Sequence, residues 1–246
     1  QGFPFFVPAF ILGAHLHVFG PNTFERDLEQ ILAHNMIPPF FPVTLQEMGA
    51  TKDIHSLSEH QVLLLGEQGE TQIMPANSPA SPDQVRIRVL RSYAHPGGAM
   101  IYRIEWHDRA IVYATDTEGY ANTDRRLVEF ARHADLIIHD AQYTEQHYLG
   151  QLPGVRSTQG WGHSTPAMAC DVAQAAEVSR LALFHYDPTY SDEALAQMEA
   201  SAQKLFPGVL AAYEGLELTL DSHGVFSTSP SAGGCYSLPI TIPSPA

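Results

Sequence analysis

Short apolar segments rich in β-branched and aromatic residues recur through the middle of the chain and predict β-strands. MIYRIEW (100–106) and AIVYATD (110–116) are two of them, and the polar turn HDR (107–109) joins them. RVLRSYA (88–94) precedes this pair, while DLIIHDA (135–141) and RLALFHYDP (180–188) repeat the pattern later in the chain. Each of these segments is followed by an ionisable residue, so the predicted strands carry ionisable side chains at their ends.

Helical patterns alternate with these strands in the second half of the chain. The predicted helices are residues 123–134, 164–178 and 191–206. Their expected N-caps are Thr123, then Ser164 or Thr165, and Ser191. Pro166 falls in the first turn of its helix, where its missing N–H costs nothing, and Pro207 stops the last helix. The alternation predicts an α/β fold.

The first half of the chain is less regular. Residues 33–54 indicate loop material, and the Pro/Ser/Asn-rich residues 75–84 predict a turn between strands. The apolar N-terminal segment FPFFVPAFIL (3–12) has no basic flank and contains two prolines, which favours an interior strand or loop over a signal peptide. We expect one domain over residues 1–220, followed by a Ser/Pro/Gly-rich tail (221–246) that lies along the surface or is partly disordered.

Ionisable residues follow several of the predicted strands. His95, Asp116, Asp140 and His185 each lie where an apolar segment ends. In sheets flanked by helices, ligands bind beyond the carboxyl ends of the strands, so these side chains could converge on one site. A histidine and an aspartate at the mouths of successive strands are common metal ligands, which makes His95 and Asp116 the leading candidates.

Composition narrows the class of protein. The 246 residues include 44% hydrophobic residues but no apolar run of about 18, which argues against a membrane span. A net charge of −14 repels polyanions, so a small substrate is favoured over a long nucleic acid. The two cysteines, Cys170 and Cys235, offer neither a metal knuckle nor a disulfide framework, and a cytoplasmic location is the default expectation.

Several motifs in order resemble one known family. They are HPGG, YRIE, VYATDTE, LIIHDAQYT, GWGHSTP and LFHYDP, between residues 95 and 188. In this order and spacing they resemble the metallo-β-lactamase fold, specifically its ribonuclease Z-like and phosphodiesterase-like branch. The resemblance implies an αβ/βα sandwich with two metal ions, usually Zn²⁺ although Mn²⁺ or Fe²⁺ is possible, at its open edge.

The resemblance also implies roles for individual residues. His95 would bind one metal, Asp116 would bridge both, and His185 would bind the other. Asp140 and His163 match an acid–histidine pair that assists protonation of the leaving group in the ribonuclease Z branch. A metal-bound hydroxide would then attack a phosphoester.

The chain departs from the family in one respect. The His-x-His-x-Asp-His metal motif normally precedes a segment like QGFPFFVPAF, with which this sequence begins, so we expect a domain that is incomplete at its N-terminus. One or two metal ions, bound more weakly than in complete relatives, are the expectation. His15 and His17 imitate the first half of that motif, but no Asp-His follows. They are either replacement ligands or partly exposed strand histidines that share one face.

The substrate can be narrowed further. Ribonuclease Z enzymes that process tRNA carry a long Gly-rich arm between the positions matching His95 and Asp116, where this chain has only 20 residues (96–115). A small phosphodiester or related phosphoester is therefore the expected substrate, and lactone or carboxylic ester hydrolysis is an alternative. A different alternative is a non-catalytic remnant that acts as a binding or oligomerisation module. For each of these functions we expect a homo-oligomer. Without the leading strands of the family the apolar N-terminal segment would be exposed in a monomer, and monomers rarely expose large apolar patches, so it should be buried in an interface.

Overall fold

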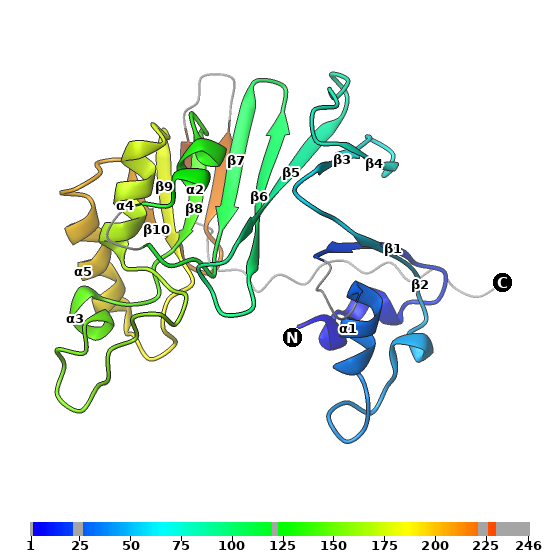
Figure 1. The fold of residues 1–246 in the computed structure, drawn as a ribbon, viewed down its shortest axis with the longest axis horizontal. Coiled ribbons are helices and arrows are strands. Elements are labelled where there is room, and N and C mark those ends of the chain that lie inside the picture. The colour runs from blue at the N-terminus through cyan, green and yellow to red at the C-terminus, as the bar shows by residue number, and fades with distance from the viewer. Residues whose placement is uncertain (1, 22–26, 120–122, 221–225, 230–246) are drawn as a thin grey trace.

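An eight-stranded mixed sheet organises the protein (Figure 1). The structure is a computed structural model that describes residues 2–21, 27–119, 123–220 and 226–229. The sheet has the order β10-β9-β8-β7-β6-β5-β3-β4. Its strands are β3 (Gln61–Leu65), β4 (Thr71–Pro75), β5 (Val85–Ser92), β6 (Ala99–Trp106), β7 (Arg109–Ala114), β8 (Leu136–Asp140), β9 (Arg180–Phe184) and β10 (Val209–Ala211). All five strand segments predicted from the sequence are thus present, and residues 75–84 connect β4 to β5 as expected.

The strand directions determine which ends meet. Strands β7, β8, β9 and β10 pair in parallel, whereas β6 is antiparallel to both of its neighbours, β5 and β7. Strand β5 therefore runs in the same direction as β7. The carboxyl ends of β5, β7, β8 and β9 consequently lie along one edge of the sheet, where α/β proteins bind ligands.

Helices cover one face of the parallel half of the sheet (Figure 1). They are α2 (Arg125–Ala131), α4 (Pro166–Ala175) and α5 (Asp192–Ala202), while the short helix α3 (Glu145–Tyr148) lies in the long connection between β8 and α4. The main core lies between them and the sheet, where Val112, Ile137 and Leu181 are fully buried against the alanines of α4, Ala169 and Ala173. Small side chains on α4 allow the helix to lie close to the strands. No helix among the described residues is both long and apolar enough to cross a membrane.

The caps explain where the helices begin. Thr165 caps α4 and Ser191 caps α5, as predicted, each by accepting a hydrogen bond from a backbone N–H of the first turn. The prediction for α2 was wrong, because Asp124 and not Thr123 accepts the capping bond, from the N–H of Arg126. The predicted helices also extended beyond the observed ends, since the chain forms turns at residues 132–133, 176–177 and 203–205.

A smaller unit is formed by the N-terminal quarter of the chain. Strands β1 (His15–Gly20) and β2 (Thr51–Ser56) pair in parallel as a separate two-stranded sheet. Helix α1 (Leu28–His34) and the 3₁₀ turns η1 (Phe3–Phe5), η2 (Val7–Phe10) and η3 (Leu45–Glu47) pack around it. The loop predicted over residues 33–54 therefore contains the end of α1, η3 and part of β2. At the other end of the chain, β11 (Glu217–Leu220) pairs with β12 (Phe226–Ser229), and the rest of the expected tail lies outside the described residues.

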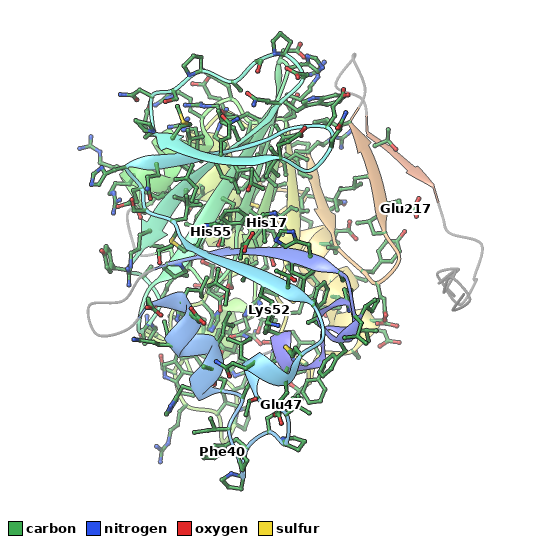
Figure 2. All side chains as sticks on the ribbon, turned by 90° about the vertical axis from the view of Figure 1, so that its right-hand side faces the viewer. His17, Phe40, Glu47, Lys52, His55 and Glu217 are labelled. Carbon is green, nitrogen blue, oxygen red and sulfur yellow. The ribbon has the colours of Figure 1, made fainter. Side chains whose placement is uncertain are left out.

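The N-terminal apolar segment is not an interior strand, contrary to one expectation. Prolines at Pro4 and Pro8 begin two 3₁₀ turns, and these turns leave large apolar side chains in solvent. Phe5, Val7 and Leu12 are 75%, 61% and 87% exposed. Phe40, from the loop after α1, is also largely exposed (Figure 2).

This exposed apolar surface predicts self-association. The substitutions Val7→Asp and Leu12→Asp together should reduce the mass measured by light scattering, because contiguous exposed apolar patches of this kind mark interfaces. Leu205→Asp, at a half-exposed leucine outside this segment, is the matched control and should leave the mass unchanged. A wild-type protein that remains a 27.0 kDa monomer at high concentration would show that the surface does not mediate assembly.

Candidate functional site

Four candidate residues meet at the carboxyl edge of the sheet. His95 lies in the turn after β5, Asp116 follows β7, Asp140 ends β8 and His185 follows β9. Two imidazole nitrogens face one oxygen of Asp116: Nε2 of His95 lies 3.9 Å and Nε2 of His185 lies 3.6 Å from Oδ1. These three side chains are each about one-third exposed, so solvent and a small molecule can reach them.

Two of these residues have unusual backbone conformations. Asp116 has φ of 55° and His185 has φ of 63°, in the left-handed region that non-glycine residues rarely adopt. Each such residue costs roughly 1–3 kcal/mol, and this strain is common at functional sites. In both cases the chain turns sharply at the strand end and directs the side chain across the sheet edge, toward its partner.

The carboxylate of Asp140 organises the surrounding backbone. It is fully buried and accepts four hydrogen bonds. Oδ2 accepts from the N–H of Asp116 (3.0 Å) and from Nδ1 of His163 (2.8 Å). Oδ1 accepts from the N–H groups of Gln142 (3.1 Å) and Ser164 (3.0 Å). A carboxylate offers about four lone-pair positions, so these four hydrogen bonds make Asp140 a poorer candidate for a metal ligand than Asp116.

His163 lies between the other two histidines. Its ring stacks on that of His185, with centroids 5.1 Å apart, and meets that of His95 edge-on at 5.2 Å. Burial acts to lower the pKa of His163, but the hydrogen bond and charge of Asp140, together with the charges of Asp116 and Glu118, raise its pKa above the ordinary value. The structure therefore brings together all five residues singled out from the sequence.

Glu118 is a site residue that the sequence analysis missed. It is buried, and it accepts hydrogen bonds from the hydroxyl of Tyr148 (2.6 Å) and from the N–H groups of Gly160 (2.8 Å) and Gly162 (2.9 Å). This one carboxylate ties the loop that carries His163 to the end of β7. Its position two residues after Asp116 was a signal, but its partners are more than 25 residues away in the sequence.

The loop makes a close approach to His95. Gly162 has φ of 93°, and a Cβ at this position would lie 2.5 Å from Cα of His95 and 2.6 Å from its ring. Only a glycine can place the loop there. The contact fixes the distance between His95 and His163, since the latter follows Gly162 directly.

Three neighbouring residues have structural roles. His139 points into the core, where burial lowers its pKa and its Nδ1 contacts the Asp140 carbonyl oxygen. Asp187 forms a turn in which it accepts hydrogen bonds from the N–H and hydroxyl of Thr189. Cys170 is a buried core residue, and burial raises the pKa of its thiol to about 11, which makes it a poor nucleophile.

The donor set fits a divalent transition metal. Imidazole and carboxylate groups suit zinc and its neighbours, and donor atoms of His95, Asp116 and His163 all lie within 4.8 Å of one another. Asp140, His163 and His185 form another such group, but Nδ1 of His163 and both oxygens of Asp140 are hydrogen-bonded to protein groups. His95, Asp116 and His185, whose facing atoms lie 3.6–3.9 Å apart in pairs, are therefore the candidate metal ligands. Among the described residues, Asp116 faces His95 on one side and His185 on the other. Water or other groups would complete the coordination of a metal held there.

The part of the chain that contains this site is similar in sequence to known proteins. Residues 14–186 match the family described as "Beta-lactamase superfamily domain". Ribonuclease Z of Thermoplasma acidophilum is 30% identical over 207 residues, which cover 75% of this chain and 63% of that relative. The chain spans less than two thirds of the length of this and other ribonuclease Z relatives.

Solved structures share the architecture. The metallo-beta-lactamase fold protein YhfI from Bacillus subtilis superposes with a TM-score of 0.53 at 18% identity, over 82% of this chain and 62% of that one. Zn(2+)-bound PqqB from Methylobacterium extorquens gives a TM-score of 0.53 at 14% identity, over 82% and 61% of the two chains. At these identities the likeness is one of fold.

The contact between Gly162 and His95 yields a prediction. Gly162→Ala should displace His95 and weaken zinc binding by about 10- to 100-fold, the range typical when a supporting contact of a ligand is lost. Gly160→Ala is the matched control, because Gly160 also has a positive φ (82°) but a Cβ there meets nothing within 4 Å. Both variants should lose roughly 1–3 kcal/mol of stability from backbone strain. Competitive titration with a zinc chelator measures the difference, and equal affinities would contradict the positioning role.

Proposed function

Since the chain belongs to the β-lactamase superfamily domain family, we propose that it is a metal-dependent hydrolase that acts on a small phosphodiester or a related phosphoester. The expected metallo-β-lactamase-like fold of the ribonuclease Z-like branch is confirmed. A ribonuclease cleaves phosphodiester bonds, so this relative supports the same class of bond as the target. The observation that carries the proposal is the Asp140–His163 pair placed directly beside Asp116.

The hydrogen bonds of the site suggest a separate role for each residue. His95, Asp116 and His185 would hold the metal, which when bound supplies a hydroxide near neutral pH and positive charge for the phosphoryl oxygens. Asp140 fixes the ring of His163 through Nδ1 and stabilises its protonated form. Nε2 of His163 then carries the proton that the leaving oxygen needs. Proton donation of this kind contributes about 10²- to 10⁴-fold to the rate.

Two features favour a small substrate. The turn between β5 and β6 is short, so no arm extends from this position beside the site. The net charge of −14 opposes binding along a long phosphate backbone. A cyclic nucleotide or another compact phosphodiester fits both constraints.

Asp116 is the first residue to test. Asp116→Ala should abolish hydrolysis of bis(p-nitrophenyl) phosphate and release the metal bound at this sheet edge, because its carboxylate faces both histidines. Asp83→Ala, at an exposed aspartate in the turn before β5, is the control and should retain full activity and metal content. Full activity in Asp116→Ala would refute the metal-hydrolase proposal.

His163 is tested by the dependence on leaving group. His163→Ala should slow a phosphodiester with an alkoxide leaving group by about 10²- to 10⁴-fold, because that oxygen requires a proton. A p-nitrophenolate hardly needs one, so its hydrolysis should change far less. The ratio of kcat values for the two substrates is the measurement. Equal losses on both would show that His163 binds substrate instead of donating a proton, and a faster reaction on carboxylic esters than on either phosphodiester would favour an esterase.

A further inference from the structure

A second cluster of histidines and an aspartate lies on the two-stranded sheet of β1 and β2. In the register of this parallel pair, His17 lies opposite Asp53, and Phe19 lies opposite His55. Because side chains alternate along a strand, His15, His17, Asp53 and His55 all share one face. Figure 2 shows His17 and His55 next to each other on this face. The cluster shares no residue with the site around Asp116.

The opposite face explains why the polar residues are held together. Leu16 of β1 and Ile54 of β2 pack against a small core that contains Met36, Leu45 and Met48. Lys52 is also kept away from the histidine face, because its Nζ donates to the carbonyl oxygens of residues 48 and 50. The apolar contacts fix the register of the two strands, and that register brings the polar side chains to one place.

Possible metal-ligand atoms of the cluster point toward one another. Nε2 of His15 lies 2.7 Å and Nδ1 of His17 lies 3.7 Å from the same oxygen, Oδ2 of Asp53. Donor atoms of these three residues all lie within 4.8 Å of one another. Ligands of one tetrahedral zinc ion, each about 2.1 Å from it, lie roughly 3.4 Å apart, so small side-chain rotations bring all three to bonding distance.

The surroundings also favour a cation. Asp53 is ionised at neutral pH like any ordinary aspartate, and its carboxylate already holds Nε2 of His15 in place at 2.7 Å. The ring of His17 stacks on His55 at 5.9 Å, and Nε2 of His55 is buried without a partner among the described residues. The side chains of His15 and Asp53 are 52% and 44% exposed, which leaves room for water ligands.

We infer that His15, His17 and Asp53 form a second metal site, which binds one divalent transition ion of the zinc class and cross-links β1 to β2. The donor set, two imidazoles and one carboxylate, is the one found around Asp116, and three protein ligands with open positions suit zinc, cobalt and nickel. An ion at this position would join two strands that are separated by 30 residues of chain and form a sheet too small to be stable alone.

Metal binding in an Asp116→Ala background tests this inference. Co²⁺ added to this variant should give the visible absorption bands of a low-symmetry site at one equivalent per chain, and equilibrium dialysis should find one equivalent of Zn²⁺. A further Asp53→Asn or His17→Ala substitution should remove both the bands and the bound zinc. His60→Ala, at an exposed histidine before β3, is the matched control and should change neither.

Stability supplies an independent readout. Zn²⁺ should raise the Tm of the Asp116→Ala variant, because it binds only the folded state, and should not raise that of Asp116→Ala with Asp53→Asn. His15→Gln replaces Asp53→Asn if the latter does not fold. An unchanged zinc stoichiometry after both His17→Ala and Asp53→Asn would overturn the inference. Loss of all zinc in Asp116→Ala alone would overturn it as well, since the two sites would then not be independent.

Discussion

The buried carboxylate of Asp140 is the constraint on which the candidate site depends. A charged group in the interior is unfavourable unless its lone pairs are satisfied, and here four donors satisfy it. Those donors come from the end of β7, from the chain after β8 and from the loop before α4. One desolvated charge thus fixes the relative positions of Asp116 and His163. Glu118 does the same for the rest of the loop, so the exposed candidate ligands rest on a buried polar framework.

The sequence predicted the parts of this framework that depend on local patterns. Apolar segments gave the strands, and the residues that follow them gave four members of the site, because strand ends gather at one edge. Caps at Thr165 and Ser191 were predictable, since a hydroxyl before a helical segment satisfies the first-turn N–H groups. His163 was found only through a family resemblance. Its role depends on the contact with Asp140, 23 residues away, which no local pattern contains.

The remaining features could not be read from local patterns because they arise from packing between distant segments. The buried state of Glu118 depends on Tyr148 and the glycines of another loop. Asp53 joins His15 and His17 only because β1 and β2 pair in parallel across 30 intervening residues, and the sequence analysis considered the two histidines without it. His55 stacks on His17 and Phe19 for the same reason. The N-terminal segment forms 3₁₀ turns because Pro4 and Pro8 cannot donate to a sheet.

Strands β5, β6 and β7 form an antiparallel meander, so its two turns lie at opposite edges of the sheet. Changes in the two turns therefore have different consequences for the candidate site. The turn after β5 (93–98) opens beside His95, so a longer loop there would cover the candidate site. The turn between β6 and β7 (107–108) lies at the far edge, a strand length of about 20 Å from Asp116. Insertions can therefore accumulate at residues 107–108 without reaching the chemistry. The same turn is a suitable attachment point for a fluorophore or an affinity tag that must leave the candidate site unperturbed.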